Sequence, residues 1–187
     1  YTISESRGKN RQNTINDVVV ETLKNHSDYI DCTFKTEVRI PESKILWGKY
    51  FPVDVCVYKG DELIEIILIK APASNLIQNK VNTLNSINSD ITRLSGLDGI
   101  NIKLFNFLPS KSPWFKQNEN IKKIESNTPF FLTKSGANYK FNVDEIYIIF
   151  EIDGVEKCLS KKEVKSLFNE NPIKNIIIKE SNYKGTH

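Results

Sequence analysis

The sequence predicts an α/β protein of mixed α+β type, in which a central mixed β-sheet is flanked by helices. Helical and strand patterns follow one another as helix, strand, two strands, helix, strand, two strands, helix, strand. The 187 residues are 39% hydrophobic and 26% charged, which suits one domain with a buried core. The chain shows no repeat and no linker, so residues 1–187 are predicted to form a single domain.

The first part of the chain predicts a helix, a strand and a hairpin in turn. In "TINDVVVETLKNH", residues 14–26, apolar side chains recur at helical spacing. "CTFKTEVRI", residues 32–40, alternates charged with uncharged side chains and predicts a half-buried strand that Pro41 ends. Residues 54–70, "DVCVYKGDELIEIILIK", predict two strands joined by the turn "KGDE".

The segment after Lys70 predicts a long amphipathic helix, with Ser74 as its cap and Gly96 as its stop. One face of this helix is apolar and comprises Leu76, Ile77, Val81, Leu84, Ile87, Ile91 and Leu94. The opposite face carries hydrogen-bonding side chains, namely Asn75, Asn79, Asn82, Ser86, Ser89 and Arg93. Three interpretations of this polar face stay open: contact with DNA, burial in a dimer, or simple hydration.

The last part of the chain predicts shorter elements around a long excursion. In chain order these are a strand at 101–107, the excursion "LPSKSPWFKQNENIKK" at 108–123, a hairpin at 143–160 that turns at Asp153-Gly154, a helix at 161–170 and a strand at 173–179.

The composition limits the function classes. Cys32, Cys56 and Cys158 are odd in number and widely spaced, which favours a reducing cytoplasm over a disulfide frame or a zinc site. The opening "YTISESRGKNRQ" has no apolar segment and is not expected to be a secretory signal, and no apolar run is long enough to span a bilayer. With only two histidines, His-based catalysis is disfavoured, while a net charge of +3 permits a nucleic-acid partner without requiring one.

The hairpin at 54–70 begins with Asp54 and ends with Lys70. Carboxylates that hold a hard cation, together with a lysine beside the attacking water, are the groups that Mg²⁺-dependent phosphodiester cleavage needs. Side chains two apart on a strand share a face, so Leu68 lies on the face of Lys70, while Glu65 points the other way unless a bulge intervenes. The alternative is that both charges merely end two strands in solvent, which does not explain a lysine closing so apolar a strand.

"FPVDV…IEIILIK" followed by "SNLIQNKVN" resembles the catalytic core of the PD-(D/E)xK nuclease superfamily, in particular the type II restriction endonucleases. The match covers about residues 12–94, and it implies a catalytic core over about 12–108 with DNA-contacting elements in 109–187. The resemblance implies a Mg²⁺ cofactor, double-stranded DNA as substrate and a homodimer. By the same resemblance Asp54 is the metal-binding aspartate and Lys70 the catalytic lysine, and two further positions match residues that some members use, Glu21 and Gln78.

Leu68 departs from the motif, because it stands where the family has a second carboxylate. A glutamate from elsewhere would then complete the metal site, and the two candidates are Glu21 and Glu65, with strand geometry favouring Glu21. A catalytically inactive DNA-binding or partner subunit that kept the fold is the alternative. An interaction protein without DNA affinity is a third possibility.

DNA contacts are expected from two segments. In the excursion, lysines surround Trp114 and Phe115, a composition typical of a loop that touches phosphates and a groove, and the lysines are Lys111, Lys116, Lys122 and Lys123. A solvated loop anchored by one tryptophan would have the same composition. The second segment is the polar helix face, from which Asn75, Asn79 and Asn82 are the candidate contacts.

Overall fold

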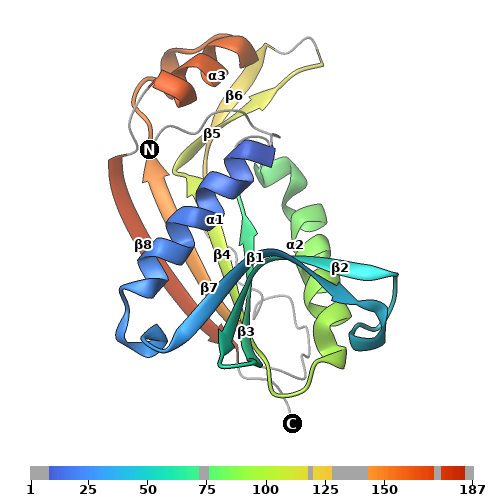
Figure 1. Ribbon diagram of the computed structural model, residues 1–187. Helices are drawn as coiled ribbons and strands as arrows, with labels where there is room; N and C mark the ends of the chain where they lie inside the picture. The colour runs from blue at the N-terminus through green and yellow to red at the C-terminus, as the bar shows by residue number, and fades with distance from the viewer. Residues whose placement is uncertain (1–8, 72–75, 118–119, 128–142, 171–173, 184–187) are drawn as a thin grey trace.

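The computed structural model describes residues 9–71, 76–117, 120–127, 143–170 and 174–183. In these residues a six-stranded mixed sheet has the order β1-β2-β3-β4-β7-β8, and a separate two-stranded sheet pairs β5 with β6 (Figure 1). Helices pack on both faces of the large sheet, so the predicted fold class is confirmed.

The elements follow the chain as α1 (Lys9–Lys24), β1 (Cys32–Pro41), β2 (Tyr50–Lys59), β3 (Glu62–Lys70), α2 (Leu76–Arg93), β4 (Asn101–Pro109), β5 (Lys111–Phe115), β6 (Ile121–Ser126), β7 (Val143–Glu151), α3 (Lys161–Glu170) and β8 (Lys174–Tyr183). Strands β1, β2 and β3 form an antiparallel meander. The helix α2 then crosses over, so that β4 is parallel to β3, and β7 is parallel to β4. The sheet ends with β8, which is antiparallel to β7.

Alternating side chains of β3 divide the core into two layers. Ile66 and Leu68 pack on one face with Ile87 and Ile91 of α2, which we call the α2 face. Ile67 and Ile69 point to the other face, the α1 face, and pack with helix α1. Because a helix packs against each face of β3, its middle is buried on both faces, which explains its almost continuous apolar sequence.

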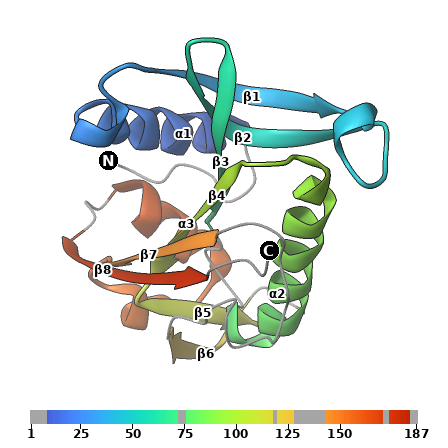
Figure 2. The same cartoon turned by 90° about the horizontal axis from the view of Figure 1, so that it is seen from below.

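The ends of the sheet carry two projections. The connection between β1 and β2 extends away from the rest of the molecule in both ribbon views (Figure 2). At the other end, the β5–β6 hairpin and α3 share a small core of their own, which includes Phe150, Ile152, Val155 and Val164. We call this second projection the β5–α3 lobe, meaning residues 111–126 and 152–170.

Three sequence predictions were wrong in detail. The excursion at 108–123 includes β5 and the first residues of β6, so it is not a loop throughout. These strands were not predicted because polar and apolar side chains alternate there too irregularly. The expected hairpin at 143–160 is absent: the chain turns at Gly154, whose φ is 91°, into a 3-10 turn at Val155–Lys157, and β7 pairs with β8 instead. Val81, predicted on the apolar face of α2, is 70% exposed, whereas Ile87, Ile91 and Leu94 are buried.

No helix among the described residues is both long and apolar enough to cross a membrane.

Candidate functional site

Lys70 is the last residue of β3 and lies on the α2 face of the sheet. Its register neighbours are Asn106 in β4 and, one strand further, Tyr147 in β7. Partners in parallel strands point to the same face, so these three polar side chains form a row across the sheet. The row lies toward the carboxyl ends of the parallel strands, the part of an open α/β sheet where ligands usually bind.

Asp54 is held beside the end of β3. The β2–β3 ladder stops at the pair Val55 and Ile67, and Asp54 lies one residue beyond it. Its Oδ2 accepts a hydrogen bond of 2.7 Å from the backbone N–H of Ile69, the residue before Lys70. The carboxylate therefore continues the ladder where backbone pairing ends, and it fixes the relative position of Asp54 and the end of β3.

A third charged side chain completes this group, and the sequence reasoning missed it. Lys70 Nζ donates to Asp90 Oδ2 over 2.9 Å, with both side chains only partly exposed, 29% and 22%. Asp90 belongs to α2, whose buried Ile87 and Ile91 anchor it against the sheet. One signal was available in the sequence: Asp90 is the single acidic residue in a helix otherwise rich in Asn and Ser.

Leu68 is a core residue. It is 2% exposed and packs beneath α2 with Ile66 and Leu104. A carboxylate at this position would lie within the apolar layer between sheet and helix, where an unpaired charge is very costly.

Glu65 lies on the opposite face from Lys70, as strand parity predicted. A bulge does interrupt the β2–β3 register, but it falls before Glu65 and leaves the residue on the α1 face. There Glu65 is 6% exposed and accepts hydrogen bonds from Tyr29 Oη at 2.8 Å and from Lys103 Nζ at 3.1 Å. Lys103 also donates to the hydroxyl oxygen of Tyr29, which closes a three-membered network.

The protonation of this network is set by burial and mutual contact. Burial raises the pKa of Tyr29 to about 12, and the neighbouring Glu65 carboxylate adds to the effect against the opposing hydrogen bond from Lys103. Burial by itself would lower the pKa of Lys103, but the hydrogen bond to Tyr29 and the charge of Glu65 together raise it above its ordinary value. Glu65 and Lys103 therefore form a stable ion pair within the fold.

Glu21 is also remote from Lys70. It lies on α1, which packs on the other face of the sheet, and its exposed carboxylate pairs with Lys24 at 2.7 Å. Neither glutamate proposed from the sequence is thus brought to Lys70. Asp90 is, while Asp54 contacts the backbone of the adjacent residue, Ile69.

Besides Glu65 on the α1 face, a buried carboxylate lies on the α2 face, and the sequence reasoning did not identify it. Glu145 of β7 is 2% exposed and accepts hydrogen bonds from Tyr147 Oη at 2.7 Å and from Asn106 Nδ2 at 3.4 Å. The alternation of Val143, Glu145 and Tyr147 in β7 was the available signal, since it places the glutamate on a buried face. Polar side chains therefore extend from Lys70 across β4 to β7.

The expected DNA contacts are only partly described. Asn75 lies outside the described residues, and the side chains of Gln78 and Asn79 are not described, whereas Asn82 is exposed on α2. In the β5–β6 hairpin Lys122 and Lys123 lie over the Trp114 ring, with Nζ 4.3 Å and 4.4 Å from its centroid. Lys123 also pairs with the buried Glu125 at 2.9 Å. Lys111, Lys116 and Lys122 are exposed, so these three are available to a phosphate backbone.

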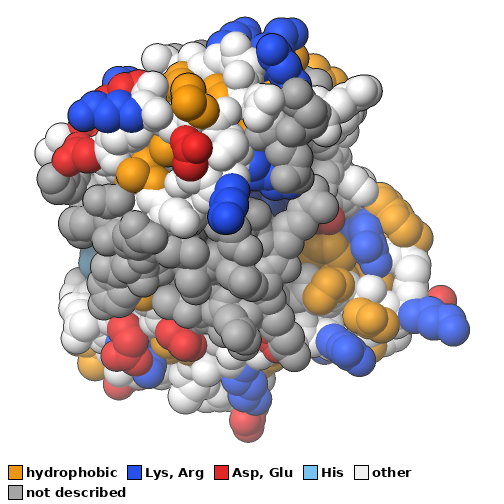
Figure 3. Space-filling model, turned by 90° about the horizontal axis from the view of Figure 1, so that it is seen from above, with side chains coloured by type: hydrophobic (Ala, Val, Ile, Leu, Met, Phe, Trp, Pro, Cys, Tyr) orange, Lys and Arg blue, Asp and Glu red, His pale blue; other side chains and the backbone are white. Residues whose placement is uncertain are grey.

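The surface charge is mixed rather than of one sign. On the face shown in Figure 3, side chains of Lys and Arg are interspersed with those of Asp and Glu. At the right of that view hydrophobic and basic side chains gather on the projecting β1–β2 connection, where Leu46, Trp47 and Tyr50 are exposed. Arg39 lies 4.7 Å from the centroid of the Tyr50 ring.

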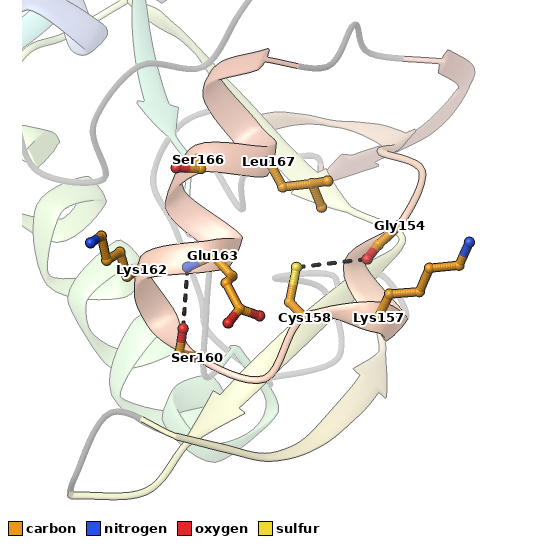
Figure 4. Close-up of a pocket in the computed structure, with 8 residues that line it drawn as sticks. All are labelled: Gly154, Lys157, Cys158, Ser160, Lys162, Glu163, Ser166 and Leu167. Atoms are coloured by element: carbon orange, nitrogen blue, oxygen red, sulfur yellow. Dashed lines mark hydrogen bonds between the residues drawn. The ribbon is translucent and has the colours of Figure 1, made fainter.

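An open pocket of about 570 Å³ lies in the β5–α3 lobe (Figure 4). Its polar groups serve the start of α3: Ser160 Oγ accepts from Glu163 N at 3.3 Å, and Glu163 Oε2 accepts from Leu159 N at 2.7 Å, a reciprocal capping arrangement. Burial, followed by the charges of Glu163 and Glu156, raises the pKa of the Cys158 thiol, which keeps it from acting as a ready nucleophile.

Comparison with known proteins gives no relative to guide the assignment: no family model, no curated protein and no solved structure matches this chain. The functional conclusion rests on the residues around Lys70.

Proposed function

We propose that this protein is a Mg²⁺-dependent endodeoxyribonuclease of the type II restriction class, which hydrolyses phosphodiester bonds in double-stranded DNA. The observation that carries the proposal is the group at the end of β3: Lys70 is paired with Asp90, and Asp54 is hydrogen-bonded to the adjacent residue. The order of elements adds support, since an opening helix, a strand with the aspartate, a strand ending in the lysine and a helix behind it follow one another.

The donor set fits a magnesium ion bound together with its substrate. Mg²⁺ usually takes one or two protein carboxylates and completes its shell with water and phosphate oxygens, and in this chain Asp54 and Asp90 would be those ligands. Among the residues that the structure describes, no three His, Cys, Asp or Glu side chains gather into a metal-holding group, so water and the substrate would have to supply the remaining ligands. When bound, the ion supplies positive charge to the scissile phosphate and acidity to a bound water.

The chain's own residues prepare the site for this chemistry. The buried middle of β3 fixes the backbone of Lys70, and the ion pair with Asp90 directs its ammonium group along the α2 face. Beside a phosphate, the Lys70 ammonium group would orient the attacking water and balance charge that develops on the phosphate oxygens. The Asp54 carboxylate would not have to move far to bind the ion, because the hydrogen bond from the Ile69 N–H already fixes its position.

Cleavage of a mixed-sequence plasmid in the presence of Mg²⁺ tests the proposal. Wild-type protein should give discrete fragments, and Lys70→Ala and Asp90→Asn should each lower the rate at least about 100-fold. Duplex binding should change only a few fold, since one group contributes little to a contact made with many phosphates. Lys59→Ala and Asp98→Asn, both at exposed positions, are the matched controls and should cleave normally. Absence of cleavage by wild type, or full activity of either site variant, would refute the assignment.

The exposed lysines of the β5–β6 hairpin are proposed to contact the DNA backbone. Replacing Lys116 and Lys122 with Ala should weaken binding equally on all sequences and reduce the slope of affinity against salt by about one to two. Trp114 should stay in place, because Lys123 still covers its ring. Fluorescence anisotropy of a labelled duplex at several salt concentrations measures both effects, and an unchanged salt slope would remove the hairpin from the interface.

A second candidate is a DNA-binding subunit with the same fold and no catalysis. Two observations favour it: Leu68 fills the core where the motif has a carboxylate, and Asp54 has a structural part in continuing the β2–β3 ladder. This candidate predicts duplex binding without Mg²⁺ binding near Asp54. Calorimetric titration with Mg²⁺ in the presence of duplex DNA, on wild type and Asp54→Asn, separates the two functions.

A further inference from the structure

The β1–β2 arm, by which we mean residues 39–50, projects from the large sheet and carries both apolar and basic side chains on its surface (Figure 2). Three large apolar side chains are exposed on it: Leu46 to 55%, Trp47 to 47% and Tyr50 to 44%. Three exposed basic side chains outnumber the single acidic one in this segment, and they are Arg39, Lys44 and Lys49 against Glu42. Apolar and basic side chains therefore share one projecting surface, as the right of Figure 3 shows.

The end of α2 holds the arm in its conformation. The backbone N–H of Leu46 donates to the carbonyl oxygen of Arg93 over 2.9 Å, and Arg93 Nη2 donates to the carbonyl oxygen of Tyr50 over 3.0 Å. The Arg93 guanidinium also lies 4.8 Å from the centroid of the Phe51 ring. Gly48, at a φ of 92°, permits this close approach, because a Cβ there would lie 2.7 Å from Arg93 Nη2. The exposed apolar side chains are thus presented on a backbone that the helix fixes.

The arm lies at the same end of the sheet as the candidate site. Because β2 is antiparallel to β3, the start of β2 lies beside the end of β3, where Lys70 is. Along β2, Tyr50 is four residues from Asp54, which corresponds to about 13 Å at about 3.3 Å per residue. On α2, Arg93 follows Asp90 by less than one turn. A DNA duplex whose backbone lies at Lys70 would therefore pass within reach of the arm.

We propose that the β1–β2 arm is a DNA-binding wedge, in which Lys44 and Lys49 contact phosphates while Trp47 enters the stack between neighbouring base pairs. The inference rests on the proposed function in one respect, the DNA that it takes as ligand. Phosphate contacts alone would leave the exposed apolar side chains in water, whereas base faces offer them an apolar surface. Insertion unstacks a base step at a cost in free energy, so the arm favours duplexes that are already weakened beside the cleavage site.

An acidic protein partner is the alternative ligand, since Trp, Tyr and Arg are also common at the centres of protein interfaces. Two observations favour DNA. The exposed basic side chains that accompany the aromatic ones complement a phosphate backbone. The arm also starts beside the end of β3, so one ligand can contact the arm and the candidate site together.

The affinities for a paired and a mismatched duplex test the wedge. Fluorescence anisotropy compares a mixed-sequence duplex with the same duplex carrying adjacent central mismatches, in Mg²⁺ and with Lys70→Ala in every protein to prevent cleavage. The Lys70→Ala protein should bind the mismatched duplex about tenfold more tightly, because its bases are already partly unstacked. Adding Trp47→Ala should abolish this preference. The matched control adds Ile30→Ala, at a position 76% exposed near the opposite end of β1, and should keep it.

The phosphate contacts are tested by the salt dependence of the same affinities. Replacing both Lys44 and Lys49 with Ala should weaken binding to the two duplexes alike and reduce the slope of affinity against salt by about one to two. Lys59→Ala, at an exposed position at the far end of β2, is the control and should leave the slope unchanged. An unchanged slope in the double variant would overturn the phosphate contacts.

The outcomes separate the wedge from the proposed function. A mismatch preference that survives Trp47→Ala, or no preference in the Lys70→Ala protein, overturns the wedge, while cleavage of plasmid by wild type would still support the nuclease. A preference that depends on Trp47, in a protein whose wild type cleaves no DNA, supports the wedge and refutes the nuclease. Binding to neither duplex overturns both.

Discussion

Replacing Glu65 by Gln should destabilise the fold by about 3 kcal/mol, because Glu65 is a buried partner of Lys103 and Tyr29. The substitution keeps the volume and can still accept one hydrogen bond, but it removes the charge that balances the Lys103 ammonium group. Breaking a buried ion pair by removing one partner costs about 3–5 kcal/mol. Lys103 is 20% exposed, so water reaches it and the lower end of that range applies.

Urea unfolding followed by circular dichroism measures this loss. A matched variant with Glu62→Gln, at an exposed position on the same strand, should change stability by less than about 0.5 kcal/mol. Replacing the whole network by apolar groups, with Tyr29→Phe, Glu65→Leu and Lys103→Met, should recover most of the loss, since no charge is then left unpaired. A Glu65→Gln protein as stable as wild type, yet unable to cleave DNA, would show that this network is not structural and that Glu65 belongs to the active site.

Two further predictions concern the core and the network. Leu68→Glu should destabilise the protein by several kcal/mol and should not restore cleavage to Asp90→Asn, because position 68 is 2% exposed beneath α2; urea unfolding and plasmid cleavage check this, and a stable variant with recovered cleavage would contradict it. The pKa of Tyr29 is raised from 10.0 to about 12, so its contribution to stability is complete below pH 10 and is lost as the pH rises to 12. The stability difference between wild type and Tyr29→Phe should therefore shrink by about 2–3 kcal/mol over that window, and a pH-independent difference would exclude the raised pKa.

The sequence predicted best where local pattern and tertiary burial agree. The strand ending in Lys70 and the helix at 161–170 follow from composition and periodicity alone, and both have the predicted ends. The hairpin expected at Asp153-Gly154 was wrong in its second strand. The chain does turn at Gly154, but β7 pairs with β8 rather than with the residues that follow the turn. Turn chemistry is local, whereas the choice of β8 as the partner of β7 depends on the whole sheet.

The candidate site shows the same division. Asp54 and Lys70 could be proposed as site residues because they begin and end one hairpin, so their spacing in the sequence indicates how their strands lie in the structure. Asp90 was missed because its position beside Lys70 depends on how α2 lies across the sheet. Glu145 was missed for a similar reason, since β7 reaches this face only through parallel pairing with β4.

The position of Asp90 offers a physical reason for Leu68. On the α2 face, the side chain at position 68 lies under the helix, so leucine there stabilises the contact between sheet and helix. A carboxylate supplied from α2 reaches Lys70 from the partly exposed side of that contact and leaves the apolar layer intact. Position 68 can therefore serve the packed core while Asp90 supplies the charged group from α2. The position of Asp90 still depends on the core, because Ile87 and Ile91 of α2 must pack correctly for Asp90 to meet Lys70. A change that loosens α2, without touching a charged group, is therefore expected to lower the proposed cleavage activity as well as stability.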